Sequence, residues 1–272
     1  MPHATLRFYA ELNDFLPPDD RDRSVERPFN VRPSIKDLIE AAGVPHTEVD
    51  LLLVNGESVD FAYPVRDGDR ISVYPVFESL DITAVTRVRP EPLRELRFVL
   101  DVHLGRLAAY LRLAGFDTVY RNDRDDAELA GIAAGGRVLL TRDQGLLKRR
   151  AVTRGYWLRA TSPRTQLAEV LRRFDLLGAV RPFCRCLRCN AKVHPVPKAD
   201  VITKLPPRTR QYYDAFFRCP ECGRIYWRGG HFDALRGLLE HAMNEARITT
   251  KEQAVEERGA PAECSGTVTT GC

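Results

Sequence analysis

The sequence lacks any apolar run long enough to span a bilayer, and its first residues lack the charged-then-apolar layout of a signal peptide. Cysteine is also scarce, with seven residues in 272, and four of them form two Cys-x-x-Cys pairs. Such pairs favour a metal site in a reducing compartment over a disulfide framework. These features predict a cytoplasmic protein with no membrane contact. The length and a hydrophobic fraction of 44% allow two or three globular domains.

Charge is distributed unevenly along the chain. Residues 1–80 hold 8 basic and 15 acidic side chains, whereas residues 81–180 hold 18 and 12, and residues 181–230 hold 11 and 3. An acidic head therefore precedes a basic body. A basic body favours contact with a polyanion, although a solvated basic surface is the simpler alternative.

The first 81 residues predict a small mixed domain. Strand-like segments occur at 5–10, 49–54 and 65–75. A helix is expected to begin after Ser34 and to end at Gly43. The Asn-Gly pair at 55–56 predicts a hairpin turn.

The order of these elements, with the phrases Val-Asn-Gly-Glu and Asp-Gly-Asp-Arg-Ile, resembles the ubiquitin-like β-grasp of sulfur carriers of the ThiS and MoaD kind. Those carriers use a free Gly-Gly carboxyl terminus, and no Gly-Gly lies near residue 80. The resemblance thus implies the fold and argues against sulfur transfer. A module that contacts a partner or substrate and a passive structural domain both stay open. Residues 82–95 hold two prolines and predict a linker.

Short apolar strands alternate with helices through residues 96–180, which predicts a parallel sheet. In such sheets ligands bind at the carboxyl ends of the strands. Asp101 and Asp143 each end a strand and should meet at that rim, while Asp125 or Asp126 arrives at the start of a helix. Clustered carboxylates are costly unless a divalent metal neutralises them. The pattern therefore predicts a metal-dependent phosphodiesterase.

Two motifs in this region are specific. They read Asp-x-x-Leu-Gly-Arg-Leu-Ala-x-x-Leu-Arg-Leu-x-Gly at 101–115 and Leu-Leu-Thr-Arg-Asp-x-x-Leu-Leu at 139–147. Both resemble the Mut-seven C-terminal RNase domain family, over about residues 96–240. The resemblance implies an α/β protein in which a PIN-like three-layer domain with a parallel sheet follows an N-terminal β-grasp (ubiquitin-like) domain and precedes a C-terminal zinc ribbon. It also implies a metal-dependent ribonuclease.

These considerations give a complete set of expected boundaries. They are 1–81 for the ubiquitin-like β-grasp domain, 82–95 for the linker, 96–180 for the PIN-like nuclease domain, 181–243 for the zinc ribbon with a closing helix, and 244–272 for a disordered tail rich in Glu, Thr and Gly.

The resemblance assigns four carboxylates to catalysis. Asp101 and Asp143 match the acidic positions that would hold Mg²⁺ or Mn²⁺, and Asp125 and Asp126 both fall in the middle acidic segment. Either of the latter two could instead be only a helix N-cap. PIN nucleases usually place a further acid near the fourth strand, but residues 159–162 contain none. One bound ion is therefore as compatible with the sequence as two.

Arginines are expected beside the same rim. Arg106, Arg112 and Arg142 lie close to the acidic residues in sequence, and the planar guanidinium of Arg142 could hold a phosphate. A salt bridge that restrains the acidic cluster is an equal alternative.

The most specific metal signal is the pair of knuckles Cys186/Cys189 and Cys219/Cys222, separated by 29 residues. Four thiolates suit a closed tetrahedral zinc site with a structural role. Redox cysteines are the alternative, and Cys184 could replace a ligand in a shifted register. An excursion loop is expected at 195–207.

Aromatic and basic residues follow the second knuckle. Tyr226 and Trp227 could stack on unpaired bases while Arg228 holds a phosphate. Packing of Trp227 over the ribbon is the alternative.

Together these features predict a metal-dependent ribonuclease acting on RNA, most simply single-stranded, that the basic ribbon holds. The alternative from another class is a non-catalytic RNA-binding adaptor whose β-grasp head recruits a protein partner. The sequence contains no readable determinant of RNA specificity.

Overall fold

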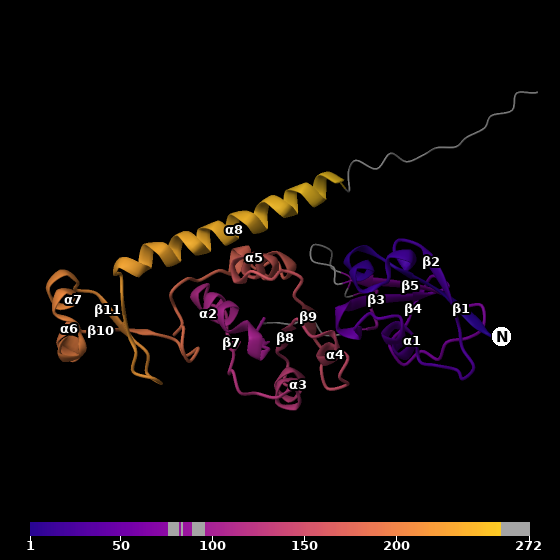
Figure 1. The fold of residues 1–272 in the computed structure, drawn as a ribbon, viewed down its shortest axis with the longest axis horizontal. Coiled ribbons are helices and arrows are strands. Elements are labelled where there is room, and N and C mark those ends of the chain that lie inside the picture. Colours follow the sequence, from indigo (N-terminus) through magenta and orange to yellow (C-terminus); the bar gives the residue numbers. More distant parts are fainter. Residues whose placement is uncertain (76–81, 83, 89–95, 257–272) are drawn as a thin grey trace, which may run out of the picture.

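The structure is a computed structural model that describes residues 1–75, 82, 84–88 and 96–256 (Figure 1). Three bodies lie in a row, with the head at one end, the α/β domain in the middle and the ribbon at the other end. A long helix, α8 (Gly230–Glu256), runs back from the ribbon over the middle body. The expected linker lies largely outside the described residues.

The head contains a five-stranded sheet in the order β2-β1-β5-β3-β4. The central pair β1 and β5 is parallel and the other pairs are antiparallel. The elements are β1 (His3–Phe8), β2 (Ser24–Pro28), α1 (Ile35–Ala41), β3 (Val49–Val54), β4 (Glu57–Ser58) and β5 (Arg70–Pro75), with short 3-10 turns at Ala10–Phe15, Pro18–Asp20 and His46–Glu48.

Local signals in the head are confirmed where the sequence is most specific. Ser34 and Asp37 form a reciprocal capping box at the start of α1. Gly43 adopts a φ of 112° just after the helix, a region that favours glycine. Asn55 and Gly56 both have positive φ, as the two-residue hairpin turn requires.

The middle body contains a four-stranded parallel sheet in the order β7-β6-β8-β9. Its elements are β6 (Phe98–Leu100), a 3-10 turn (Val102–Leu104), α2 (Gly105–Leu113), β7 (Thr118–Val119), α3 (Asp126–Ala134), β8 (Val138–Thr141), α4 (Gln144–Leu147), β9 (Gly155–Trp157), α5 (Pro163–Arg173) and a 3-10 turn (Leu177–Ala179).

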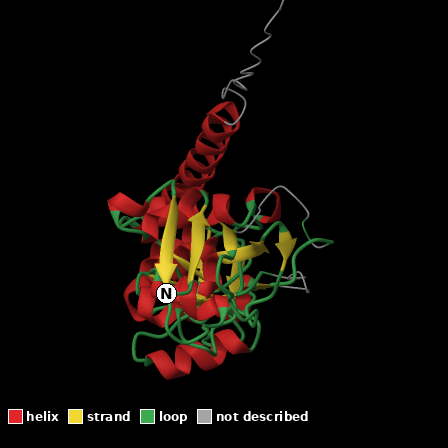
Figure 2. Cartoon of the chain, turned by 90° about the vertical axis from the view of Figure 1, so that its right-hand side faces the viewer, coloured by secondary structure: helices red, strands yellow, loops and turns green. Residues whose placement is uncertain are grey.

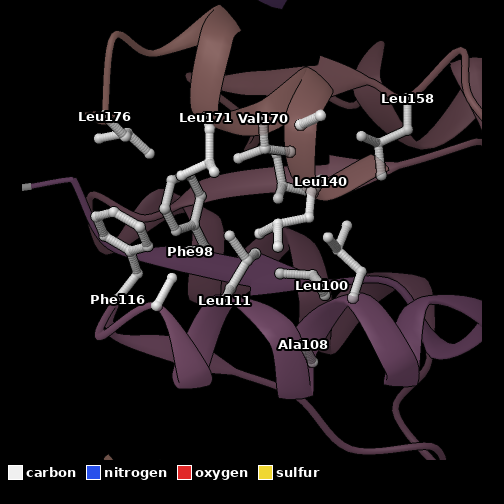
Figure 3. Close-up of a cluster of buried hydrophobic side chains, with 14 of the residues drawn as sticks. Phe98, Leu100, Ala108, Leu111, Phe116, Leu140, Leu158, Val170, Leu171 and Leu176 are labelled. Atoms are coloured by element: carbon white, nitrogen blue, oxygen red, sulfur yellow. The ribbon is translucent and has the colours of Figure 1, made fainter. Parts of the chain in front are cut away.

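Successive residues of the central strands face opposite cores. Phe98 and Leu100 join the cluster shared with α2, α5 and α8, whereas Val99 joins the cluster beneath α3 and α4. Figure 3 shows the first of these cores, with Leu111 on one side of the sheet residues and Val170 on the other. Two fully apolar strand faces between helical layers give the predicted three-layer α/β domain.

The ribbon contains an antiparallel sheet in the order β10-β11-β12. Its elements are β10 (His194–Val196), α6 (Lys198–Val201), a 3-10 turn (Ile202–Lys204), α7 (Pro207–Tyr212), β11 (Phe216–Arg218) and β12 (Ile225–Trp227). The excursion expected at 195–207 is thus partly helical, because Val201 and Leu205 pack on Phe216 as a small core.

The closing helix is longer than the sequence analysis expected. We predicted a disordered tail from residue 244, yet α8 continues to Glu256. Leu239, Ala242 and Ala246 repeat at helical spacing and are buried against the middle body, which extends the helix. Residues 257–272 lie outside the described residues. Figure 2, viewed from the head end, shows this helix projecting beyond the strands. None of the described helices combines the length and apolarity needed to cross a membrane.

Candidate active site and metal centre

The carboxyl ends of β6 and β8, here called the acidic rim, lead into Asp101 and Asp143, the two acids that the sequence analysis placed after these strands. Leu100 pairs with Leu140 in the parallel register, so Asp101 and Thr141 lie next to each other at the ends of adjacent strands. Asp101 is 8% exposed. Its amide donates to the Leu140 carbonyl at 3.1 Å, which fixes the backbone at the rim.

Thr141 contacts both residues, through the side chain of Asp101 and the backbone amide of Asp143. Its hydroxyl is fully buried and donates to Asp101 Oδ2 at 2.6 Å. The Thr141 hydroxyl oxygen also accepts a hydrogen bond from the Asp143 backbone amide at 2.9 Å. Our sequence analysis quoted this threonine within a motif but gave it no role. Its signal was its position, as the last residue of a buried strand and directly opposite Asp101.

Both rim carboxylates also organise the turns that follow them. Asp101 Oδ1 accepts from the Val102 amide at 2.6 Å, and Asp143 Oδ1 accepts from the Gly145 amide at 2.7 Å. Asp143 itself is exposed. The two side chains are thus held at helix or turn starts, where the local backbone dipoles favour negative charge.

Asp125 and Asp126 occupy structural positions at the start of α3. Asp125 is its N-cap and forms a reciprocal capping box with Glu128. Asp126 pairs with Arg149, with Oδ2 and Nη2 3.0 Å apart. Asp125 therefore has the N-cap role that the alternative interpretation predicted, whereas Asp126 has an ion pair that it did not predict. Neither contact involves Asp101 or Asp143.

The three arginines expected near the rim separate into two places. Arg106 and Arg142 are exposed, and the carbonyl of Arg142 accepts from Trp157 Nε1 at 3.2 Å. Arg112 is 4% exposed and lies at the far end of α2, where it donates to the carbonyls of Thr118, Leu187 and Arg188. We expected Arg112 beside the acidic rim. That expectation was wrong, because α2 runs antiparallel to β6 and carries Arg112 to the opposite end of the sheet.

The four knuckle cysteines converge, as the sequence predicted. The Sγ atoms of Cys186, Cys189, Cys219 and Cys222 all lie within 4.8 Å of one another. Thiolates around a tetrahedral zinc at about 2.3 Å would be separated by roughly 3.8 Å, so the donor set fits this ion. Among the described residues this is the one group of three or more potential ligands that close together. Cys184 lies apart, donating to the Arg181 carbonyl at 3.0 Å.

Tyr226 contacts a metal ligand. Its hydroxyl lies 3.1 Å from Cys186 Sγ and accepts from the Leu187 amide at 3.1 Å. Burial raises the pKa of Cys186, but hydrogen bonds from Tyr226 and from the amides of Cys189 and Arg188 outweigh it and bring the value down to about 6. The thiolate, which is the form that binds zinc, is therefore favoured.

The other two ribbon residues contact aromatic rings of the protein, with Trp227 partly buried and Arg228 exposed. Trp227 belongs to the small ribbon core, with its ring centroid 6.5 Å from that of Phe216. Arg228 lies over the ring of Phe232 at 5.5 Å. Packing, the alternative we considered for Trp227, accounts for this placement.

The first knuckle is attached to the edge of the parallel sheet. Asn190 Oδ1 accepts from the Thr118 amide at 2.9 Å, and its Nδ2 donates to Asp117 at 2.9 Å. Burial raises the pKa of Asp117, but the hydrogen bonds from Arg137 and Asn190 outweigh burial, so the pKa of this carboxyl is lowered. The zinc knuckle therefore docks beside the amino-terminal end of β7, away from the acidic rim.

Two family models match the chain. The Mut7-C RNAse domain matches residues 96–239, and the Mut7-C ubiquitin domain matches residues 1–81. These matches confirm the resemblance drawn from the motifs. No curated protein and no solved structure matches the chain.

Proposed function

Because the chain belongs to the Mut7-C RNase domain family, we propose that it is a metal-dependent ribonuclease whose site is the rim formed by Asp101 and Asp143. The observation that carries this proposal is the buried hydroxyl of Thr141, which donates to the Asp101 carboxylate and accepts from the Asp143 backbone amide at the ends of adjacent parallel strands. Both residues lie at the carboxyl ends of the strands, where ligands usually bind in such sheets.

The donor chemistry of the rim suits Mg²⁺ or Mn²⁺. Magnesium is often held by one or two carboxylates, with waters and substrate phosphates completing the octahedron. Asp101 and Asp143 would be those two ligands, and Asp125 or Asp126 would join only by leaving its present contacts. A bound ion lowers the pKa of water and stabilises the leaving oxygen. Thr141 fixes the direction of the Asp101 carboxylate, so this side chain would not have to reorient when the ion binds.

We further propose single-stranded RNA as the substrate. Exposed Arg106 and Arg142 flank the rim and could pair with phosphates. The first knuckle docks at the other end of α2, a helix of 9 residues that spans about 14 Å. A strand held by both the rim and the basic ribbon would therefore have to run the length of this helix. Arg228, Tyr226 and Trp227 would contribute at the ribbon end.

The zinc site serves the fold in this proposal. Four thiolates leave no open position for substrate, which is typical of structural zinc.

Cleavage of an end-labelled single-stranded RNA tests the proposal. Zinc-bound wild-type protein would be compared with Asp143→Asn in Mn²⁺, Mg²⁺ and a chelator that leaves the zinc bound. We expect metal-dependent cleavage that falls by at least about a hundredfold in the variant. Asp123→Asn is the matched control, because this exposed residue pairs with Arg121 and follows β7 rather than β6 or β8. Equal cleavage by all three proteins would refute the site.

A non-catalytic RNA-binding adaptor is the second candidate. It is favoured by the engagement of Asp125 and Asp126 in a helix cap and an ion pair, which leaves two rim acids. An adaptor would cleave nothing, would bind RNA in a salt-sensitive manner, and would bind it equally or more tightly as Asp143→Asn. In that case a protein partner of the head would carry the function.

A further inference from the structure

The segment that carries Asp143 is held from the head. Residues 142–152, here called the Asp143 segment, connect β8 to β9 through α4. Leu146, Leu147 and Val152 pack it onto the middle body. Two of its polar contacts, at Lys148 and Val152, lead instead to residues of the head that precede it by 108 and 106 positions.

The far end of the segment is bonded directly to the head. His46 Nε2 lies 2.9 Å from the Val152 carbonyl, and Lys148 Nζ donates to the Glu40 carbonyl at 3.1 Å. His46 is 6% exposed and its Nδ1 lies 2.6 Å from Glu40 Oε1. Glu40 lies in α1 and His46 begins the following 3-10 turn, so the packing of these elements on the head core fixes the positions of both groups.

The near end is held through one side chain that the head supports. Trp157 Nε1 donates to the carbonyl of Arg142, the residue before Asp143. The Trp157 ring lies 5.0 Å from the ring of Phe15, and the Trp157 amide donates to Glu48 Oε1 at 2.5 Å. Glu48 is fully buried and Phe15 is 9% exposed, so both contacts are shielded from water.

We propose that the ubiquitin-like head is the positioning partner of the Asp143 segment, gripping it at Arg142 through Trp157 and at Lys148 and Val152 directly. The proposal rests on the proposed function, because it takes Asp143 as a rim ligand. A segment held at both ends presents its carboxylate in one geometry, and small displacements of a metal ligand are costly to catalysis. The head thus binds a segment of its own chain.

Hydrogen exchange of the full chain tests whether the head holds the Asp143 segment, and it does not require catalytic activity. Phe15→Ala removes the ring beneath Trp157, and Lys148→Met removes the bond to the Glu40 carbonyl without touching the head core. Phe29→Ala is the matched control, because Phe29 packs on the same head core beside Pro2. We expect amides of residues 142–152 to exchange at least about tenfold faster in the first two variants, with residues 116–121 unchanged. No change, or an equal change in Phe29→Ala, would overturn the proposal.

Kinetic measurements distinguish a failure of the positioning proposal from a failure of the ribonuclease proposal. Phe15→Ala should lower kcat about tenfold at unchanged KM for RNA, and Phe15→Leu should restore most of it. Faster exchange with an unchanged kcat would overturn positioning of Asp143. Absence of cleavage by the wild type in every metal would refute the ribonuclease, whereas the exchange experiment would still decide whether the head holds the segment.

Discussion

The two outer strands of the central sheet are covered by different domains through different chemistry. At β9, the outward amide of Trp157 donates to Glu48 of the head. At β7, the outward amide of Thr118 donates to Asn190 of the first zinc knuckle, and its carbonyl accepts from Arg112. Uncovered edge strands present unpaired backbone groups that invite pairing with other chains. Each flanking domain therefore supplies a side chain that pairs with an outward backbone amide of one edge strand.

The two edges should respond to different treatments. The β7 cover depends on a knuckle held by four thiols, whereas the β9 cover depends on a buried ionisable carboxylate. Chelation should open one edge, and a change of pH should weaken the other.

Removal of zinc should have the largest effect. Apparent zinc-binding free energies of structural sites are roughly 10–16 kcal/mol, so the ribbon should unfold without its ion. Hydrogen exchange would rise sharply at residues 116–121, which lose Asn190, while residues 155–159 at the other edge stay protected. Equal deprotection at both edges would contradict independent covers.

Arg112→Met should be the most damaging single substitution. It leaves the carbonyls of Thr118, Leu187 and Arg188 without their donor, and a lost buried network costs about 3–5 kcal/mol. Arg112→Lys should restore little, because one ammonium cannot reproduce the fork of the guanidinium. Denaturant unfolding measures the loss, and full recovery in the lysine variant would contradict the role of the fork.

Glu48→Ala should cost about 1–3 kcal/mol, because the Trp157 amide loses its acceptor at the β9 edge. Glu48→Gln keeps an acceptor there and should cost less. Denaturant unfolding of both variants at one pH gives the comparison, and an equal loss in the two would show that the acceptor is not what matters.

The same glutamate should make stability depend on pH. Burial raises the pKa of Glu48, against the attraction of Arg173 and Arg159. The contribution of this group is therefore fully present below the ordinary value of 4.5 and is lost as the pH rises through the folded-state pKa. The stability of wild type relative to Glu48→Gln should fall as pH increases from 4.5 to 8. A difference that does not change with pH would contradict the account.

Thr141→Val should have the smallest effect on stability, and it tests a contact at the end of the inner strand β8. Loss of the hydroxyl removes the bonds to Asp101 and to the Asp143 amide, at about 1–2 kcal/mol. Cleavage should fall about tenfold, and Thr141→Ser should recover it. If the valine and serine variants cleave equally, the hydroxyl does not position the acids.

Local and periodic signals predicted most of the fold. The capping box at Ser34, the Asn55 turn and the alternation of strands with helices each reflect the energetics of neighbouring residues, so they can be read without tertiary structure. The paired knuckles likewise predicted convergence of Cys186 with Cys222, because four thiolates at that spacing have few other uses.

The contacts between domains could not be predicted from sequence. Glu48 and Trp157 are 109 positions apart and neither belongs to a motif. Arg112 showed the same limit, because its sequence neighbours suggested the rim while the direction of α2 determined its place. Thr141 was within reach of sequence reasoning, since its register opposite Asp101 follows from the parallel pairing.

The most direct test of the central claim is the binding of Mn²⁺ to the zinc-bound protein, followed by electron paramagnetic resonance. Wild type, Asp101→Asn, Asp143→Asn and the control Asp123→Asn would be titrated side by side. If the rim holds the ion, both rim variants should bind Mn²⁺ at least about tenfold more weakly, and the control should match wild type. Equal affinity in all four proteins would show that the rim is not the metal site.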